Sequence, residues 1–338
     1  MEISKSQLQT ALEIVKPGLA NKELIEQSTS FAFIGDRVVT YNDDISISHP
    51  IEGLELTGAV KAEKLYLLLG KLKEDKITID IEGSEILLKS GRAKAGLTLQ
   101  QEIKLPLEEE IAYKEKWKTL PKAFLDGVDF AIGSCSKDMS RPVLTCVHVV
   151  QEGFVESSDS LRIMKFALGD EMPIESFLLP ASAALTMTKL KPTKIAKGRG
   201  WIHFKTEADT ILSCRIFEDK FPDTSPFLKT TGISITLPDT ISAVLERASI
   251  FAKRDHMLDE SVQITLEPKR LKIRGEADSG WFEESIRMEY LGEEVTFHIT
   301  PHLLKGILSQ TAKGILGTDR LKFEGENWEY VTALRAKK

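Results

Sequence analysis

Long hydrophobic runs are missing from this sequence of 338 residues. The longest uninterrupted apolar stretch is the five residues Leu65–Leu69, whereas a transmembrane helix needs about 20. The amino terminus, MEISKSQLQT, lacks the apolar core of a secretory signal peptide. Together with 42% hydrophobic and 28% charged residues, these absences predict a soluble, cytoplasmic, globular protein that does not enter a membrane.

Cysteine is also scarce, with only Cys135, Cys146 and Cys214 in the whole chain. The three residues are far apart and form no CxxC pair or other spacing typical of metal ligands. We therefore expect reduced, buried thiols rather than disulfides or a zinc site.

Motifs that carry catalysis or bind nucleotides are absent as well. The sequence contains no GxxxxGK[ST], GxGxxG, GxSxG or HExxH. Asp43 and Asp44 have the chemistry to hold Mg²⁺, although an Asn-Asp-Asp turn between strands explains them more simply. We expect no enzyme activity, no cofactor and no metal, and keep as an alternative a metal-dependent phosphoryl-transfer enzyme that acts on DNA through these two aspartates.

What the sequence does contain is a repeat of nearly sixty residues. Six segments have apolar residues at helical spacing, as in Leu65, Leu68, Leu69 and Leu72, and each is followed by strand-like runs. The segments begin near residues 4, 61, 121, 181, 239 and 301. Four of them open on a related phrase, LPKAF, LPASA, LPDTI or ITPHL, which is typical of a strand end followed by the first turn of a helix.

The segments between these helices predict antiparallel sheets. Apolar and polar residues alternate in KITIDIEG at 76–83 and RLKIRGE at 270–276, with Gly, Asp and Asn turns between the runs. One amphipathic helix cannot close a core on so small a sheet, so we expect the six units to pair. The predicted fold class is α+β, with three similar domains of two helices packed on antiparallel sheets. We expect these domains at residues 1–114, 115–229 and 230–338.

The distribution of charge qualifies the acidic total. Forty-five Lys and Arg residues against 51 Asp and Glu residues give a net charge of −6. The six helical segments together have a net charge of +11, and the rest of the chain has a net charge of −17. The segments counted are 4–16, 61–73, 121–133, 181–199, 239–254 and 301–313. Lysines often solvate helix faces and helix carboxyl ends, yet an excess on most of six equivalent helices favours a surface for a polyanion backbone. Such a surface binds phosphate without reading sequence.

Four segments carry a resemblance to a known family. They are EGSEILLKSGRAKAGLTL at 82–99, FAIGSCSKDMSRPVLTCVHV at 130–149, VESSDSLRIMKF at 155–166 and KFPDTSPFL at 220–228. In this order and at these distances, they resemble the β subunit of bacterial DNA polymerase III, the β sliding clamp. The resemblance covers nearly the whole chain and implies DNA-clamp domains assembled head to tail into a homodimeric ring.

The resemblance also implies a function. The chain is expected to be a non-catalytic DNA polymerase processivity factor that encircles duplex DNA during DNA replication, without sequence specificity. Its expected partners are double-stranded DNA, the replicative polymerase, the clamp loader and other clamp-motif proteins. A monomeric, clamp-like peptide-docking module stays as an alternative, because Ala95 stands where clamps can carry a large apolar residue and the ending YVTALRAKK lacks the usual proline.

Three sets of site residues follow from the resemblance. The pocket for peptides and the polymerase is expected at Ser158, Ser160, Leu161, Arg162, Ile163, Pro222, Phe227, Val331 and Ala333. The DNA-binding residues are expected at Lys22, Lys64, Lys71, Lys137, Arg141, Lys189 and Lys191. The dimer interface is expected to bring Leu97 of one copy against Ile250 and Phe251 of the other. Leu161 stands where the family usually has His, a departure that bears on peptide preference.

Overall fold

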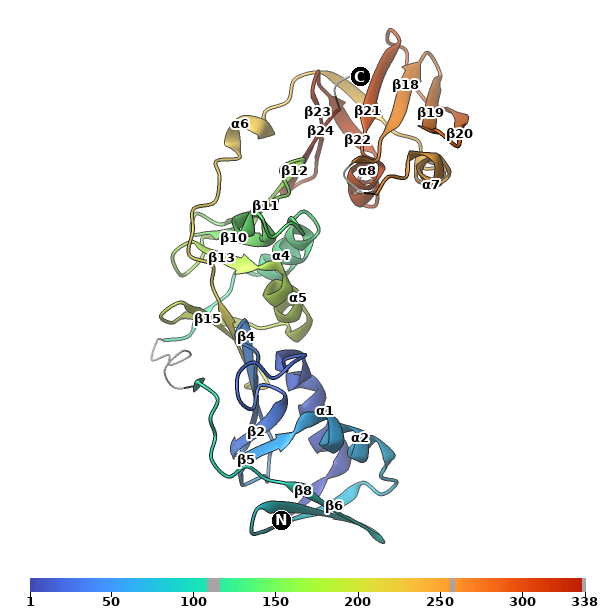
Figure 1. The fold of residues 1–338 in the computed structure, drawn as a ribbon. Coiled ribbons are helices and arrows are strands. Elements are labelled where there is room, and N and C mark those ends of the chain that lie inside the picture. The colour runs from blue at the N-terminus through green and yellow to red at the C-terminus, as the bar shows by residue number, and fades with distance from the viewer. Residues whose placement is uncertain (108–115, 256–258, 336–338) are drawn as a thin grey trace. The chain divides into compact units, whose positions relative to one another are not determined.

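The chain forms two compact units in a computed structural model that describes residues 1–107, 116–255 and 259–335 (Figure 1). The first unit comprises Met1–Leu125 and Met172–Glu218, and the second comprises Asp126–Glu171 and Asp219–Lys338. Both contain antiparallel sheets and helices, so the α+β prediction is confirmed. The predicted boundary between residues 114 and 115 lies outside the described residues, and the division into three domains stays a prediction.

The first unit contains two sheets, one of eight strands in the order β5-β2-β3-β4-β16-β15-β14-β9 and one of four in the order β1-β6-β7-β8. Buried residues alternate with less buried ones along Lys76–Glu82, as the sequence pattern predicts, whereas Ser30–Gly35 and Arg37–Tyr41 each bury four consecutive residues and are covered on both faces. The strands of these two sheets are β1 (Glu2–Ser4), β2 (Ser30–Gly35), β3 (Arg37–Tyr41), β4 (Ile45–Pro50), β5 (Leu56–Lys61), β6 (Lys76–Glu82), β7 (Glu85–Ser90), β8 (Ala93–Thr98), β9 (Lys118–Thr119), β14 (Lys194–Lys197), β15 (Trp201–Lys205) and β16 (Ile211–Arg215). Strand β13 (Phe177–Pro180) also falls within the residues of this unit but belongs to neither sheet.

The second unit repeats this plan. Within the residues of this unit, the strands of one sheet follow the order β10-β11-β12-β24-β23-β22-β17, and the other sheet has the order β20-β19-β18-β21. Its strands are β10 (Cys146–Val150), β11 (Phe154–Ser158), β12 (Arg162–Ala167), β17 (Ile233–Thr236), β18 (Val262–Glu267), β19 (Arg270–Ala277), β20 (Gly280–Arg287), β21 (Val295–Ile299), β22 (Lys313–Leu316), β23 (Arg320–Glu324) and β24 (Trp328–Ala333).

Each of the six predicted helical segments contains a helix. These are α1 (Lys5–Val15), α2 (Ala62–Lys71), α4 (Phe124–Ile132), α5 (Ala181–Leu190), α7 (Ile241–Ala252) and α8 (Pro301–Leu308). Pro301 occupies the first turn of α8, where its missing N–H leaves no intrahelical hydrogen bond unmade. Shorter helical turns are η1 (Lys16–Gly18), η2 (Pro142–Thr145) and α6 (Ser225–Leu228).

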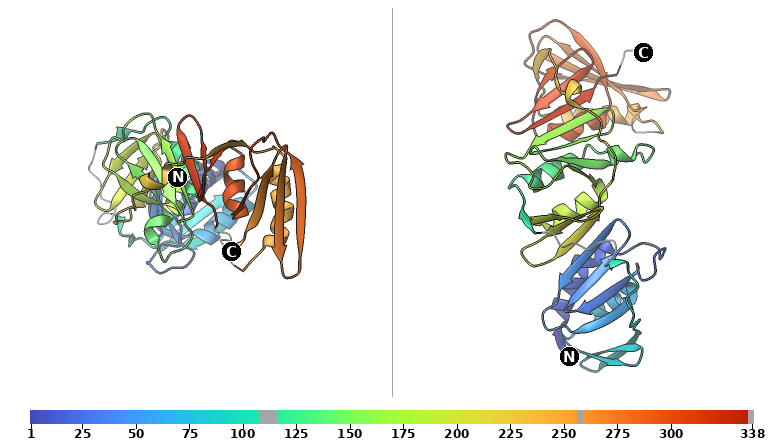
Figure 2. Two further views of the ribbon diagram at one scale, coloured as in Figure 1. Left: turned by 90° about the horizontal axis from the view of Figure 1, so that it is seen from above. Right: turned by 90° about the vertical axis from the view of Figure 1, so that its left-hand side faces the viewer.

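Each helix buries at least two residues of the apolar stripe that predicted it. In α1 the buried residues are Leu8, Ala11, Leu12 and Val15, and the helix contacts β3, β4 and α2. In the second unit α7 packs on β18, β19 and β20 and contacts α8 (Figures 1 and 2). Burying three or four such side chains contributes several kcal/mol for each helix, at roughly 1.5–3 kcal/mol per side chain.

The predicted helix at 181–199 is too long. Lys191 closes α5 in the left-handed conformation (φ 54°), the next residue is Pro192, and the chain then enters strand β14. A left-handed residue followed by proline ends a helix because neither can continue the helical hydrogen bonds. Among the described residues, no helix is both long and apolar enough to cross a membrane.

Candidate functional site

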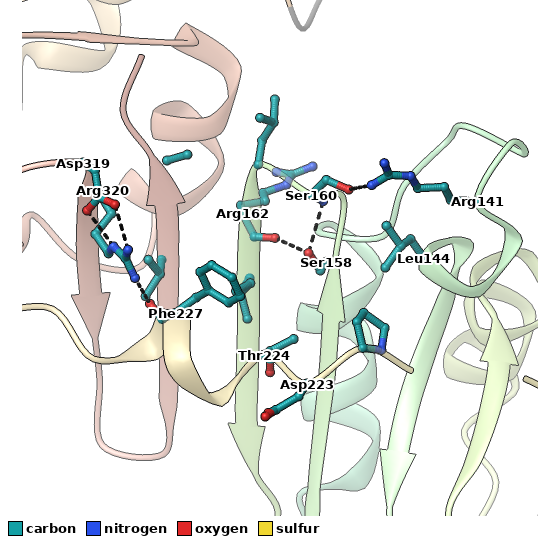
Figure 3. A pocket seen from close by; sticks show the side chains of 15 residues that line it. Arg141, Leu144, Ser158, Ser160, Arg162, Asp223, Thr224, Phe227, Asp319 and Arg320 are labelled. Carbon is teal, nitrogen blue, oxygen red and sulfur yellow. Dashed lines mark hydrogen bonds and ion pairs between the residues drawn. The ribbon is translucent and has the colours of Figure 1, made fainter. Parts of the chain in front are cut away.

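A cavity of about 420 Å³ lies in the second unit, beside the paired strands β12 and β24 (Figure 3). The structure brings all nine predicted pocket residues together in its wall. Its lining also includes Arg141, Leu144, Asp223, Thr224, Asp319 and Arg320, which the sequence analysis did not assign to a pocket. The floor is apolar where Ile163 pairs with Val331 across the two strands, and charged side chains surround it.

The turn between β11 and β12 forms a rigid wall of this cavity. Asp159 accepts hydrogen bonds from the backbone N–H groups of Leu161 and Arg162, both at 3.0 Å, and Ser160 takes a left-handed conformation (φ 76°). Ser158 Oγ accepts a bond from Ser160 N (3.2 Å) and donates one to Arg162 O (2.8 Å). Such side-chain bonds to the backbone fix a tight turn without help from a ligand.

The arginines around the cavity differ in exposure and in the number of hydrogen bonds that hold their side chains. Arg162 Nε bonds Asp159 Oδ2 at 2.9 Å, and both side chains are nearly buried, so this guanidinium mainly supports the turn. Arg141 is exposed and donates one hydrogen bond, from Nη1 to Ser160 Oγ (3.1 Å). Arg141 was predicted as a DNA contact, and the structure places it on the rim of the cavity.

The opposite rim is formed by Arg320 and the helical turn α6. Arg320 makes two bonds to Asp319, both at 2.8 Å, and donates a third from Nη1 to Phe227 O at 3.1 Å. The hydrogen bonds from Arg320 hold the pKa of Asp319 below its ordinary value. Phe227 is 52% exposed, with its ring 5.8 Å from the Arg320 guanidinium, so an apolar surface stands open beside a fixed cation.

The segment that precedes α6 is fastened to the sheet by a buried carboxylate. Glu156 on β11 accepts a hydrogen bond from Thr224 Oγ1 (2.5 Å) and contacts His148 Nδ1 on β10 (2.8 Å). The His148 ring stacks on Phe221 with 4.9 Å between centroids. Because Pro222, Asp223 and Thr224 line the cavity, these bonds position a third wall.

The sequence contained part of the signal for the missed residues. Leu144 lies in the SRPVL stretch, and Asp223 and Thr224 lie in the FPDT stretch, both quoted for the resemblance. Asp319 and Arg320 gave no signal, because RLKFEGE predicts only a strand. Their role depends on the pairing of Arg320 with Ala333, which a single sequence does not encode as a motif.

The other predicted cations are exposed and spread over both units. Lys64 and Lys71 lie on α2, Lys189 and Lys191 lie at the end of α5, Lys22 follows η1, and Lys137 precedes η2. Within residues 1–107, 116–255 and 259–335, none of these six forms an ion pair with a carboxylate. Their ammonium groups are therefore available to an anion.

The predicted basic lining of helices needs correction. With the bounds that the structure gives, the six helices carry a net charge of only +1. Most of the predicted excess lies just beyond the helix ends, as at Lys61 and Lys73, and on the segment 191–199 that follows α5. Lys61 is also paired with Glu23. The positive charge therefore flanks the helices rather than covering them.

The three predicted interface residues lie near two open sheet edges. Leu97 is on β8, an edge strand of the first unit, and is half-buried. Ile250 is 68% exposed on α7, and the neighbouring Phe251 lies 3.4 Å from the position that a Cβ on Gly280 of β20 would take. Strand β20 is an edge of its own sheet.

The Asp43–Asp44 pair forms the expected turn. Asn42 Oδ1 accepts hydrogen bonds from the N–H groups of Asp44 (3.2 Å) and Ile45 (2.9 Å), and Asp43 pairs with Arg215 at 2.7 Å. Burial, and then the charge of Asp43, raise the pKa of Asp44 above its ordinary value. In the part of the chain that the structure describes, no group of three or more His, Cys, Asp or Glu residues is arranged to hold a metal ion.

Comparison with known proteins gives matches at the level of structure. No protein family model matches the sequence. No curated protein matches it either. Among solved structures, the DNA polymerase III subunit beta from Pseudomonas aeruginosa matches with a TM-score of 0.86 and 18% identity, over 99% of both chains. The chain has the sliding-clamp fold.

Two further solved structures agree. The DNA polymerase sliding clamp from Bacillus subtilis matches this fold with a TM-score of 0.83 and 17% identity, over 100% of this chain and 99% of that one. A sliding clamp from P. aeruginosa bound to griselimycin matches with a TM-score of 0.86, 17% identity and the same coverage. The sliding-clamp fold therefore extends over the full length of this chain, with little sequence identity to support it.

Proposed function

We propose that this chain is a DNA polymerase processivity factor, a sliding clamp that tethers the replicative polymerase to duplex DNA. The observation that carries the proposal is the match to DNA polymerase III β subunits over 99–100% of this chain. The sliding-clamp fold therefore spans the whole length over which a clamp would have to act. The proposed role is non-catalytic and cytoplasmic, since a clamp acts as a tether.

The ring is proposed to close by the pairing of two copies, head to tail. Each copy has two four-stranded sheets with an open edge, β8 in one and β20 in the other. Unpaired edges expose a row of N–H and C=O groups that a second chain can pair with. Leu97 from one copy would then meet Ile250 and Phe251 from the other. A head-to-tail contact closes into a ring when the rotation between copies allows it.

Double-stranded DNA is proposed to contact the exposed lysines through its phosphates. Lys22, Lys64, Lys71, Lys137, Lys189 and Lys191 are exposed without a carboxylate partner within the described residues, as a sequence-independent contact to phosphate requires. Because the six helices themselves have a net charge of only +1, a uniformly basic lining is not proposed. The proposed contacts are a few lysines, several of them at helix ends.

The cavity in the second unit is proposed to receive peptide motifs from the polymerase, the clamp loader and other clamp-motif proteins. Its apolar floor at Ile163 and Val331 suits apolar anchor side chains, and its fixed walls mean that little ordering accompanies binding. Leu161 replaces a polar ring with an apolar side chain at the wall. We expect a preference for motifs that are more apolar at that contact.

The mass in solution tests the ring. A clamp is expected to run as a dimer near twice 37.7 kDa. It is also expected to stay on nicked circular DNA after loading by a bacterial clamp loader and to leave once the circle is linearised. Equal loss from circular and linear DNA would contradict topological binding, and a monomer at all concentrations would contradict the ring.

A monomeric peptide-docking module remains a second candidate, because all lining residues of the cavity belong to one unit. This candidate predicts a monomer that still binds a fluorescent clamp-motif peptide. A dimer retained on circular DNA would decide against it.

A further inference from the structure

Two adjoining cavities lie in the first unit, at the end of the β4–β16 strand pair that is opposite to Tyr41 and Trp201. They measure about 700 and 530 Å³, and both are lined by His49 and Ala208, so that they form one groove, the His49 groove. We infer that the His49 groove is a second docking site, for a partner protein that inserts a tyrosine with a basic residue on one side of it and an acidic residue on the other. This inference goes beyond the proposed clamp function, which assigns one peptide cavity to the second unit.

The second unit fills the corresponding place with aromatic rings. Counted along the strand registers of β4–β16 and β12–β24, His49 corresponds to Phe166 and Thr210 corresponds to Trp328. The ring of Phe130 on α4 packs against both, with its centroid 6.3 Å from that of Phe166 and 5.3 Å from that of Trp328. The second unit therefore occupies from within its own chain a space that the first unit leaves open.

Helices α1 and α4 complete this correspondence. The order of buried, half-buried and exposed residues along residues 8–15 is the same as along residues 124–131, which makes Ile14 correspond to Phe130. Isoleucine, histidine and threonine thus stand in the first unit where the second unit has three aromatic rings. An aromatic side chain buries roughly 150–250 Å², so a partner that inserts one supplies contacts that the first unit lacks.

The floor of the groove indicates which aromatic residue fits. His49 Nδ1 and Thr210 Oγ1 share a hydrogen bond of 2.7 Å, and within the described residues His49 Nε2 has no hydrogen-bond partner. Burial, followed by the positive charge of Arg37, lowers the pKa of His49, which favours the neutral ring. Nε2 of a neutral ring is a donor or an acceptor according to the tautomer, and a tyrosine hydroxyl can pair with either. A tyrosine is therefore the expected anchor.

Charged residues without ionic partners mark the two ends of the groove. The larger cavity is lined by Asp36 and Glu52, and the smaller one by Lys189, Lys191 and Glu207. All five side chains are exposed, and in the part of the chain that the structure describes none of them forms an ion pair. With histidine neutral, two carboxylates give the larger cavity a net charge of −2, and two lysines against one glutamate give the smaller one +1. A segment with one basic and one acidic residue on either side of its tyrosine complements both ends.

The same charges favour a peptide over a nucleic acid. A phosphate backbone would be attracted by Lys189 and Lys191 at one end and repelled by Asp36 and Glu52 at the other. A peptide can carry charges of both signs at the required places, whereas the backbone of a nucleic acid carries only negative charge. The partner is therefore assigned as a protein segment.

The walls of the groove are fixed without a partner. Gln7 Nε2 on α1 donates a hydrogen bond to Glu52 O at 2.9 Å. Arg37 donates to Asp209 Oδ2 at 2.7 Å and to Asp209 O at 2.6 Å, and these bonds hold the turn that carries Ala208. Because the walls are already ordered, little conformational entropy is lost when a segment docks.

Methyl NMR on the full-length protein tests this assignment, because Ile14 lines the His49 groove and Ile163 lines the peptide cavity. The probe is an acetylated and amidated pentapeptide with the sequence Lys-Ala-Tyr-Ala-Glu. At millimolar concentration it is expected to shift the Ile14 methyl signal in a saturable way and to leave Ile163 unchanged. Three matched peptides replace one residue each. Alanine for tyrosine is expected to weaken binding at least about tenfold, phenylalanine for tyrosine about fivefold, and glutamine for glutamate about threefold.

Two exposed alanines give a crossed control. Ala208→Phe adds a ring to the wall that both cavities of the His49 groove share, and Ala333→Phe adds one to the peptide cavity. We expect Ala208→Phe to weaken the tyrosine peptide at least tenfold and Ala333→Phe to leave its binding unchanged. For a fluorescent clamp-motif peptide the expected effects of the two variants are exchanged.

The outcomes separate this site from the proposed clamp function. A shift at Ile163 alone, or at neither methyl group, would overturn the docking site and leave the clamp function untouched. Equal binding of the alanine peptide would overturn the aromatic anchor. A thymidine pentanucleotide that shifts Ile14 at lower concentration than the tyrosine peptide would assign the groove to nucleic acid and overturn the protein partner.

Discussion

The strand pairings β4–β16 in the first unit and β12–β24 in the second have corresponding registers but different surfaces. Ile45 pairs with Cys214 in one, and Arg162 pairs with Thr332 at the same place in the other. By this correspondence, the buried Tyr41 and Trp201 of the first unit match Ser158 and Arg320 of the second. Two large rings fill the first site, and a cavity occupies the second.

The segments that follow reinforce this difference. In the first unit Leu105 joins a buried cluster with Ala32, Tyr41, Ala59 and Trp201. In the second unit Phe227 stays half exposed beside its cavity. One backbone plan therefore gives either a filled site or an open cavity, according to the side-chain volume at a few register positions.

Removing the Trp201 ring, which fills the site in the first unit, should lower stability more than any other change proposed for these two sites. Trp201 is 2% exposed and contacts Tyr41 with 6.2 Å between ring centroids. Trp201→Ala is expected to lower the free energy of unfolding by about 3–5 kcal/mol, because the cavity it leaves lies among rigid strands. Chemical denaturation measures this. Phe227→Ala at the open site is the matched control, and an equal loss there would contradict the comparison.

Acid should weaken the first unit before the second. Burial lowers the pKa of His203 on β15 to about 4 from an ordinary value of 6.5, and its counterpart on β23 is Lys322. The unfolded chain therefore takes up a proton between pH 6.5 and 4 that the folded chain refuses. Stability falls as the pH drops through that window, by about 3 kcal/mol in all.

Hydrogen exchange measured at pH 7 and pH 4.5 is the readout for this titration. We expect protection to fall more in β15 and β16 than in β23 and β24. His203→Gln keeps a side-chain polar group facing Ser213, which His203 contacts at 2.8 Å, and should flatten the pH dependence. An unchanged pH profile in that variant would assign the effect to another group.

Adding a large side chain to the cavity of the second unit should fill it, as Tyr41 and Trp201 fill the corresponding site of the first unit. Ala333 is exposed in the cavity wall, so Ala333→Phe adds a ring without breaking a buried hydrogen bond. We expect the unfolding free energy to be unchanged and the affinity for a clamp-motif peptide to fall at least tenfold, about 1.4 kcal/mol. Ala208→Phe, at an exposed position of the first unit, is the control. Full peptide binding by Ala333→Phe would remove the cavity from the proposed function.

Loosening the rim should have the smallest effect. Arg320→Ala removes two bonds to Asp319 and one to Phe227 O, and we expect about a fivefold loss of peptide affinity, near 1 kcal/mol. Arg320→Lys should recover little, because an ammonium cannot make the paired bonds of a guanidinium. Calorimetric titration measures both variants. Complete rescue by Lys would show that charge alone matters at this rim.

Much of the fold was predictable because it depends on local pattern. The stripe of Leu8, Ala11, Leu12 and Val15 predicts α1 almost to the residue. The helix at 181–199 was overextended because the left-handed Lys191 has no signature of its own, unlike a glycine at such a position. The overextension past Lys191 also explains part of the positive charge that was wrongly assigned to the helices, and the rest lies just beyond the ends of the other helices, as at Lys61 and Lys73.

The cavity was predictable only through the resemblance. Ser158 and Val331 lie far apart in the sequence, and no periodic pattern joins them. The contribution of Arg320 depends on the registers of two strand pairs, which arise from tertiary packing. The contact between Trp201 and Tyr41, which fills the site in the first unit, was not predicted either. These two residues become neighbours only once β4 and β16 have paired.

The pairing of β12 with β24 has a consequence for the timing of synthesis. Thr332 Oγ1 approaches Leu161 O, a residue 171 positions earlier in the chain. A ribosome that has translated the first part of the cavity wall must therefore continue through Ala333 before the cavity exists. During that interval the emerging chain can fold its first unit, yet the cavity that would bind a peptide has not formed.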